Sequence, residues 1–515
     1  MQQTPDLIIS DNVFGRRPGE LSAIRIASGR ITAIESLAEV DITSALAGSA
    51  STLDIRGSLL LPGLIDSHVH AIATGMFMLS ENLQEVTSLA QLEAAIQRIA
   101  ARGERVVRLG GLDLSRLDKA EHPLLDRAWL DGIVSDRPLI IKSVEGHSSW
   151  FNSLGWEMVI DERIMAEEGL SREAVDEMYR RGRLHGGAYE KHTTPLYDSY
   201  SHEERAAGMR LVLDTARRMG LTGIHCLEGY GDFRRKDFQL ILGLDGQGCD
   251  LTLYCRDTTP KLAHELGVPR FGGCWCVDGA IGSHSAAVSE PYADRAGHCG
   301  ELYFDDAELA AWIRSGIEHD MQVCVHAIGD RALEQTIRIY EELAPQHDLA
   351  RSRHRVDHFI LGDEGQAERA ARLGLCSSMQ PAFDARWGGE SGGYATRLGS
   401  KRALETNPVG TMHSCGLKVG GSSDSYITPL DPLGGMHAAM NHHNPRHRVD
   451  FDTAVAMFTS VGAWLGHADE DRGSIAAGQS ANFTVVNGDR SLDAASVRAT
   501  IHRGTVTFDS ELETA

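Results

Sequence analysis

Residues 61–70 read Leu-Pro-Gly-Leu-Ile-Asp-Ser-His-Val-His, an apolar strand that ends in two histidines spaced by one residue. Because alternate side chains of a β-strand share a face, His68 and His70 should point together into whatever the strand lines. Two neutral imidazoles that converge at the end of a strand form half of a divalent-metal site. A His-x-His pair alone is weak evidence, so its meaning depends on further ligands downstream.

Three later apolar segments end in residues that could complete such a site. One ends at His326 and the next at His358. The third ends at Asp424, after small residues that allow a ligand to approach the backbone closely. In a (β/α)8 barrel the ends of the strands deliver the catalytic groups. The predicted metal ligands are therefore His68, His70, His326, His358 and Asp424.

Short motifs along the whole chain support this interpretation. They are LPGLIDSHVH at 61–70, RPLIIKSVEGHSSWFNS at 137–153, VDGAIGSHSAA at 277–287, VHAIGDRA at 325–332, RHRVDHF at 353–359, MQP at 379–381, GSSDS at 421–425, DPL at 431–433 and GSIAAGQSANFTVV at 473–486. Taken jointly and in this order, they resemble the amidohydrolase superfamily, and more closely its YtcJ-like branch, amidohydrolase family 3. The resemblance implies an α/β protein with a distorted (β/α)8 TIM barrel and a small β-sandwich built from both termini.

The strand pattern divides the chain into three predicted domains. The barrel strands are assigned to 59–66, 221–227, 250–256, 270–277, 321–327, 354–360, 374–380 and 417–424. Two further strand-like segments, 105–110 and 138–144, would make ten, so they are assigned to an insertion. Short strands at 6–10, 23–27, 30–35, 52–55, 482–487 and 499–507 are assigned to the sandwich. The predicted domains are a β-sandwich at 1–58 and 466–515, a barrel at 59–73 and 220–465, and an α/β insertion at 74–219 that covers the active site.

Composition excludes several classes of partner. A formal net charge of -22 disfavours nucleic acid and anionic membranes, because both would repel the chain. The N-terminus carries no apolar run typical of a signal peptide, and no segment is long enough to span a bilayer. Nine cysteines without framework spacing indicate reduced, buried thiols. A cytoplasmic location is therefore expected.

The resemblance implies hydrolysis of a C–N bond in an amide, formamide or cyclic amide. In the family, the residue at the position of Asp424 binds the metal, takes a proton from the attacking water and passes it to the leaving nitrogen. His358 is the second predicted catalytic residue. The expected cofactor is one or two divalent metal ions, with Zn2+ first and Mn2+ or Fe2+ as alternatives, and a small-molecule substrate and a homodimer are expected. The alternatives are a deaminase or an ester or lactone hydrolase on the same scaffold, and a catalytically silent ligand-binding protein.

The fourth barrel strand departs from the family pattern. A lysine four residues before a DG pair is usually carboxylated and bridges two metals, but here the pair is Asp278-Gly279 and the residue four before it is Cys274. Cys274 could simply fill the barrel interior, bind zinc as a thiolate, or mark a protein that has lost activity. The single-metal interpretation uses His68, His70, His326 and Asp424 as ligands. The thiolate interpretation adds a second site formed by Cys274, His326 and His358.

Period-2 alternation assigns the faces of two strands. On strand 4 it puts Cys274, Cys276 and Asp278 on one face. On strand 6 it points Asp357 away from His358, so Asp357 is expected to be a structural partner of the barrel helices.

Four residues are candidates for contact with the substrate. His147 and Trp150 lie in the motif of the insertion that the resemblance places over the pocket. His284 lies in the loop after the DG pair, and Gln380 closes the seventh strand at the catalytic end of the barrel.

Overall fold

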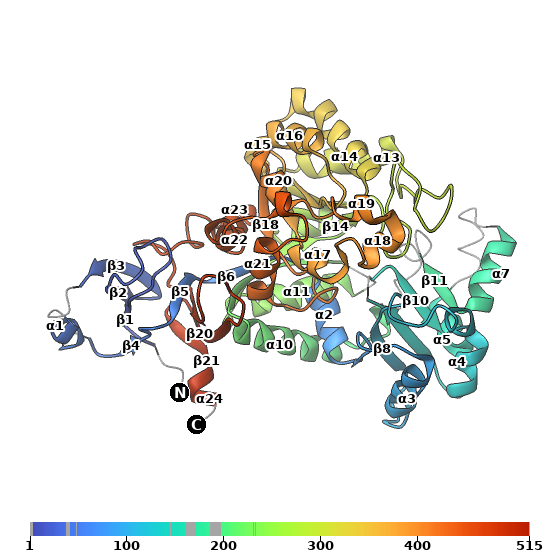
Figure 1. Ribbon diagram of the computed structural model, residues 1–515, viewed down its shortest axis with the longest axis horizontal. Helices are drawn as coiled ribbons and strands as arrows, with labels where there is room; N and C mark the ends of the chain where they lie inside the picture. The colour runs from blue at the N-terminus through green and yellow to red at the C-terminus, as the bar shows by residue number, and fades with distance from the viewer. Residues whose placement is uncertain are drawn as a thin grey trace.

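The computed structural model describes residues 4–37, 42–47, 49–144, 146–160, 171–185, 197–229, 231 and 233–513. Three parts lie side by side in Figure 1: a pair of small sheets, a central barrel, and a third body on the opposite side of the barrel from the small sheets. Among the described residues, no helix combines the length and the apolar character needed to cross a membrane.

The central barrel confirms the predicted fold. Its eight strands follow one another in chain order around a single sheet. They are β6 (Leu64–Val69), β12 (Leu221–Glu228), β13 (Asp250–Cys255), β14 (Arg270–Cys276), β15 (Gln322–Ala327), β16 (Arg355–His358), β17 (Cys376–Met379) and β18 (Lys418–Gly421). A parallel bridge between Val69 and Ser425 links the last strand back to the first, and the Asp424 amide donates to the His68 carbonyl over 2.9 Å. All eight strands correspond to predicted segments.

Helices surround the barrel and connect its strands. Those on its outside include α10 (His202–Arg218), α11 (Arg234–Leu244), α12 (Lys261–Glu265), α13 (Asp306–Glu318), α14 (Asp330–Leu343), α15 (Leu349–Ser352), α16 (Glu364–Arg372), α20 (Val409–Ser414), α22 (Phe451–Met457) and α23 (Ser460–Leu465). Further helices follow β6, β17 and β18: α2 (Ala71–Met78), α17 (Pro381–Trp387), α18 (Gly393–Leu398), α19 (Ser400–Ala403) and α21 (Pro432–Met440).

The predicted first strand, 59–66, is divided between two sheets. Leu59–Pro62 forms β5, which pairs antiparallel with β19 (Phe483–Asn487), and the barrel strand β6 begins only at Leu64. Gly63 makes the crossing feasible, because a Cβ at this position would lie 2.2 Å from the Thr222 hydroxyl oxygen. One apolar run therefore serves the sandwich first and the barrel second.

Two four-stranded sheets pack together as the predicted β-sandwich. One has the order β3 (Arg30–Ser36), β2 (Ser22–Ala27), β1 (Leu7–Ser10), β4 (Thr52–Asp54); the other has the order β21 (Thr505–Asp509), β20 (Ser496–His502), β19, β5. Their shared core includes Ile8, Ile24, Phe483 and Ile501. The segment 499–507, predicted as one strand, is a hairpin because Arg503 and Gly504 both have positive φ, 48° and 77°. The short helices α1 (Ile42–Ala47) and α24 (Ser510–Glu513) flank these sheets.

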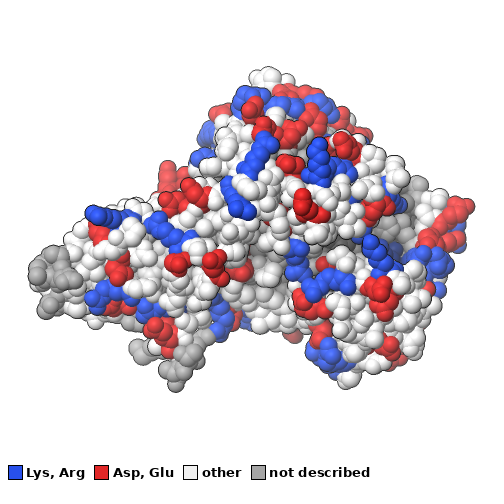
Figure 2. Space-filling view, in the orientation of Figure 1, with Lys and Arg blue, Asp and Glu red and all other residues white. Residues whose placement is uncertain are grey.

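The third body is a five-stranded sheet with its own apolar core. Its strands are β7 (Glu81–Asn82), β8 (Val107–Leu112), β9 (Leu139–Ser143), β10 (Ser148–Phe151) and β11 (Arg183–His185). Its helices are α3 (Leu89–Ala100), α4 (Arg127–Ile133), α5 (Ser153–Val159) and α7 (Arg172–Arg181). The two extra strand-like segments of the sequence correspond to β8 and β9, and both lie in this separate sheet. Figure 2 shows basic and acidic side chains interspersed over this face of the molecule.

Candidate metal centre and substrate cavity

The two histidines of β6 meet Asp424, which follows β18, at the end of the barrel. The Nε2 atoms of His68 and His70 lie 3.5 and 3.3 Å from Oδ1 of Asp424. Nε2 of His68 and Oδ1 of Asp424 are buried and have no hydrogen-bond partner among the described residues. Buried polar atoms are normally paired, so two that face each other without partners indicate a site for a cation.

Hydrogen bonds behind the two histidines fix their tautomers. Nδ1 of His68 lies 2.7 Å from Oδ2 of Asp357, and Nδ1 of His70 lies 2.9 Å from the Leu227 carbonyl oxygen. The imidazoles must donate in both bonds, because a carbonyl and a carboxylate only accept. Each Nε2 atom therefore carries a lone pair toward Asp424, as a metal ligand requires.

The position of Asp357 corrects the prediction that it faces the barrel helices. Its carboxylate lies inside the barrel, where it accepts from His68 and from the buried guanidinium of Arg355. His358 also points inward, and its ring centroid is 4.8 Å from that of His68. Both side chains can point inward because His358 and Phe359 have positive φ, 75° and 53°, which breaks the alternation at the strand end. The Arg355 ion pair and His68 hold the pKa of Asp357 well below its usual range despite burial.

A second group of donors lies beside the first. Sγ of Cys274 is 3.8 Å from Nδ1 of His326 and 4.0 Å from Nε2 of His358. Within the described part of the chain, three sets of donor atoms lie within 4.8 Å of one another: His68, His70 and Asp424; His68, Cys274 and His358; and Cys274, Cys276 and His326. Cys274 belongs to two of them.

This grouping differs from both predicted ligand sets. His326 does not join His68, His70 and Asp424, as the single-metal interpretation required, and it is grouped with Cys276 rather than with His358. Cys276 was not predicted as a ligand. Its signal in the sequence was alternation, because Cys276 shares a face of strand 4 with Cys274.

Unusual backbone geometry places several of these donors. Gly272, Gly273 and Cys274 have φ values of 112°, 47° and 68°, and the pairing of β14 with β15 shifts register between Phe271 and Trp275. Asp424 has a φ of 53°. Residues other than glycine rarely adopt positive φ values. Those that do are concentrated at functional sites.

The protonation of the donors in the metal-free protein follows from burial and neighbouring charge. Burial lowers the pKa of His358 to about 4, so its imidazole is neutral at physiological pH. Burial would raise the pKa of Asp424, but His68, His70 and His358 together outweigh it and the pKa is lowered. The contact with Cys276, together with burial, raises the pKa of Cys274 well above its usual range. Asp424 therefore offers a carboxylate, His358 a neutral imidazole and Cys274 a protonated thiol.

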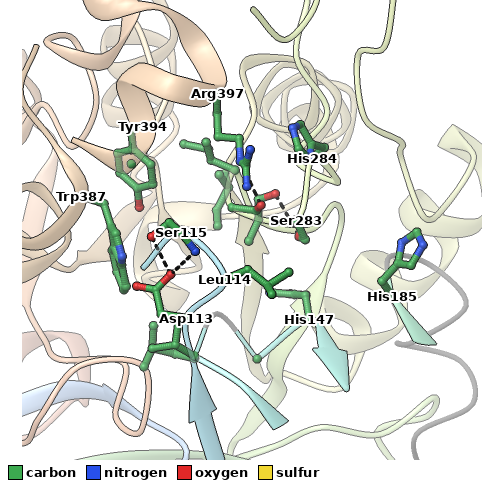
Figure 3. Close-up of a pocket in the computed structure, with 18 of the residues that line it drawn as sticks. Asp113, Leu114, Ser115, His147, His185, Ser283, His284, Trp387, Tyr394 and Arg397 are labelled. Atoms are coloured by element: carbon green, nitrogen blue, oxygen red, sulfur yellow. Dashed lines mark hydrogen bonds between the residues drawn. The ribbon is translucent and has the colours of Figure 1, made fainter. Parts of the chain in front are cut away.

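A cavity of about 600 Å³ opens over the donors. Barrel loops and the third body line it together, and His70, Cys274, Cys276, His326 and Asp424 form part of its floor. Figure 3 shows Trp387 and Tyr394 side by side on one wall, with His147 and His185 on the other. Phe383, Tyr426 and Ile427 add further apolar surface. The cavity therefore combines a polar floor with a largely aromatic wall.

Two of the four predicted substrate contacts line this cavity. His147 does so, and its ring centroid is 5.7 Å from that of His326. His284 also lines it, with Nε2 2.9 Å from Oδ1 of Asp294, whose other oxygen forms an ion pair with Arg397 (Figure 3). Because the carboxylate only accepts, His284 donates from Nε2, and its Nδ1 is an acceptor.

Trp150 and Gln380, the other two predicted substrate contacts, are not among the residues that line this cavity. Trp150 is 2% exposed, lies in the core of the third body and is stacked under the guanidinium of Arg183. Gln380 is fully buried, and its Oε1 accepts from Nδ1 of His358 over 2.9 Å. Trp150 therefore packs in the core of the third body. Gln380 orients His358, a predicted metal ligand.

Several cavity residues had no signal in the sequence. They are Asp113 and Ser115 after β8, His185 on β11, Asp294 on a barrel loop and Arg397 on α18. These segments are far apart in the chain, and loops without a motif give no indication of which cavity they will reach. The side chain of Asp113 accepts from Ser115 as drawn in Figure 3, which shapes the loop that lines the cavity.

The fold and the donor groups together define a (β/α)8-barrel protein with a metal-binding site at the ends of its strands. The sequence model of the amidohydrolase family matches residues 51–508, and the chain belongs to that family. It is therefore a hydrolase by family.

Relatives and solved structures agree with this assignment. YtcJ of Bacillus subtilis (strain 168) is 29% identical over 86% of this chain and 87% of its own length. N-substituted formamide deformylase of Arthrobacter pascens is 23% identical over 95% of this chain and 94% of its own. An uncharacterized metal-dependent hydrolase from Pyrococcus furiosus has the same fold, with a TM-score of 0.69 at 23% identity over 94% of this chain and 98% of its own.

Proposed function

We propose that this protein is a metal-dependent hydrolase that cleaves a C–N bond in an amide, a formamide or a cyclic amide. One observation carries the proposal. In a buried site, Nε2 of His68 and Nε2 of His70 both lie within 3.5 Å of Oδ1 of Asp424, and their lone pairs face it. A bound cation would compensate such an arrangement. Membership of the amidohydrolase family and similarity to a formamide deformylase support the bond type.

His68, His70 and Asp424 would hold the cation, for which Zn2+ suits imidazole and carboxylate donors, with Mn2+ or Fe2+ as alternatives. When bound, such a cation lowers the pKa of a water ligand, so that hydroxide is available near neutral pH. Asp357 and the Leu227 carbonyl keep Nε2 of the two histidines free of protons for this purpose.

Asp424 would accept the proton of the attacking water and then donate it to the leaving nitrogen. Its lowered pKa keeps the carboxylate ionised at neutral pH, which the first step requires. His358, the other predicted catalytic residue, is held by Gln380 with Nε2 toward the donors, where it would orient the scissile group.

The cavity would bind the remainder of a small-molecule substrate. Trp387, Tyr394 and Phe383 favour an apolar or aromatic substituent beside the scissile bond. His284 would accept a hydrogen bond from the substrate through Nδ1, and His147 would contact the substrate near His326. We also propose a cytoplasmic homodimer, on the grounds of the family and the composition.

Removal and restoration of metal test the proposal. The purified protein is assayed on N-substituted formamides, anilides and cyclic amides before chelation, after chelation, and after addition of Zn2+, Mn2+ or Fe2+. We expect chelation to abolish release of the amine and one of the ions to restore it. A protein that contains no stoichiometric metal, or that loses nothing on chelation, would support the silent ligand-binding alternative.

A further inference from the structure

We infer that Cys274, Cys276 and His326 form a thiolate-containing cation site of their own, beside the site of His68, His70 and Asp424. The site would bind a divalent cation that accepts thiolate ligands, such as Zn2+. The site goes beyond the proposed hydrolysis, since it requires a second ion and assigns Cys276 as a ligand.

The distances agree with ligands that share one ion. Zinc bonds of about 2.3 Å to sulfur and about 2.0 Å to nitrogen at a tetrahedral angle put the two ligand atoms about 3.5 Å apart. Sγ of Cys274 and Nδ1 of His326 are 3.8 Å apart, and Sγ of Cys276 lies within 4.8 Å of Sγ of Cys274 and of a ring nitrogen of His326. Three protein ligands with a position left open are the arrangement of catalytic zinc sites, of which a Cys2His set is one type.

His326 is oriented for this role. Its Nε2 lies 3.4 Å from the Gly279 carbonyl oxygen, which can only accept, and 3.7 Å from Oδ1 of Asp278. The Asp278 carboxylate is itself fixed by the backbone N–H groups of Ile328 and Gly329. The proton of His326 is therefore on Nε2, and its Nδ1 lone pair points toward Cys274.

The backbone of β14 is shaped to bring the two thiols to the cavity. Three consecutive residues, Gly272 to Cys274, have positive φ, although Cys274 carries a side chain that disfavours it. Cys276 and Cys274 both line the cavity, as His326 does. A thiol that only filled the barrel would not require this backbone. Cys324 is such a thiol: it belongs to the same apolar cluster, its Sγ lies 3.4 Å from Asp357, and it is in none of the donor sets.

Cobalt titration followed by absorption spectroscopy tests the site. Cobalt bound to thiolate gives an intense charge-transfer absorption in the near ultraviolet, whereas cobalt bound only to imidazole and carboxylate does not. We expect the band in the full-length wild-type protein and roughly half its intensity in Cys276→Ser, because one of two thiolates is lost. Cys274→Ser should lower it likewise, and the double variant should abolish it.

Cys226→Ser is the matched control, because Cys226 is a buried barrel thiol outside the donor sets. It should leave the band at full intensity, and circular dichroism verifies that each variant is folded. A wild-type protein without the band, or Cys276→Ser with the full band, would overturn the inference. Failure of the proposed hydrolysis is a separate result, because it is measured by amine release and the band is measured without substrate.

Discussion

The two donor groups at the barrel end differ in how they are prepared for a cation. His68, His70 and Asp424 present lone pairs that already face one another. Among the described residues, buried Nε2 of His68 and Oδ1 of Asp424 have no hydrogen-bond partner. Cys274, Cys276 and His326 present thiols, and the pKa of Cys274 is raised well above its usual range. The first group therefore already offers donor atoms to a cation, whereas Cys274 of the second group must lose its proton to bind one.

Their supports differ as well. His68 is held by an ionised carboxylate that also pairs with Arg355, whereas His326 of the second group lies 3.4 Å from a neutral acceptor, the Gly279 carbonyl oxygen. A charged partner raises the basicity of an imidazole ligand more than a neutral one does. The first group should consequently bind its ion more tightly, and the following variants test that difference.

Asp424→Asn should have the largest effect. We expect kcat to fall by about 10³-fold, because the proton acceptor is lost while the amide oxygen can still bind the ion. Amine-release kinetics and metal analysis of the same preparation measure both consequences. Asp305→Asn, which alters the N-cap of α13 away from the cavity, is the control and should keep its turnover. Near-normal turnover in Asp424→Asn would refute the assigned role.

Asp357→Asn should act on the first group and spare the second. We expect the dissociation constant of the tighter ion to rise about 10- to 100-fold, because His68 loses its charged partner. Arg355 also loses its buried counter-charge, so the variant should unfold more readily. Competition with a chelator measures the affinity, and the cobalt–thiolate band reports on the second group. An equal loss from both groups would show that the two do not act separately.

Gln380→Met should have a smaller effect. It removes the acceptor for Nδ1 of His358, and we expect kcat to fall about tenfold with metal content close to the wild-type value. Gln380→Glu keeps an acceptor at the same place and should recover most of the activity. If Met and Glu behave alike, the hydrogen bond to His358 does not matter for turnover.

The pH dependence of the metal-free protein should distinguish the groups by sign. The folded pKa of His358 is about 4, below its ordinary value of 6.5, so the unfolded chain binds more protons between these values and stability falls as the pH is lowered through that window. The pKa of Cys274 is raised, so its contribution is lost as the pH rises above the ordinary thiol value of 9.0. Thermal unfolding across pH should show a fall in Tm of a few degrees on each side. His358→Gln should remove part of the acid-side fall only.

The barrel strands and most of the donor residues could be predicted from patterns within short segments of the sequence. All eight barrel strands overlap predicted segments, because apolar runs bounded by turn residues are a local signal. Donors at the ends of β6, β15, β16 and β18 could be named for the same reason. The predictions failed where the chain departs from regular geometry: the hairpin at Arg503 and Gly504, and the inward turn at His358.

The sequence by itself determined the barrel, the donors at its strand ends and the absence of lysine from strand 4, since each depends on residue type and on spacing within one segment. Only the tertiary structure decided which donors share a site. The grouping of His326 with Cys276, the bond from His68 to Asp357 and the bond from His358 to Gln380 join different strands. The distances between strands depend on barrel closure and on positive φ at Cys274, His358 and Asp424, which spacing along a single strand does not encode.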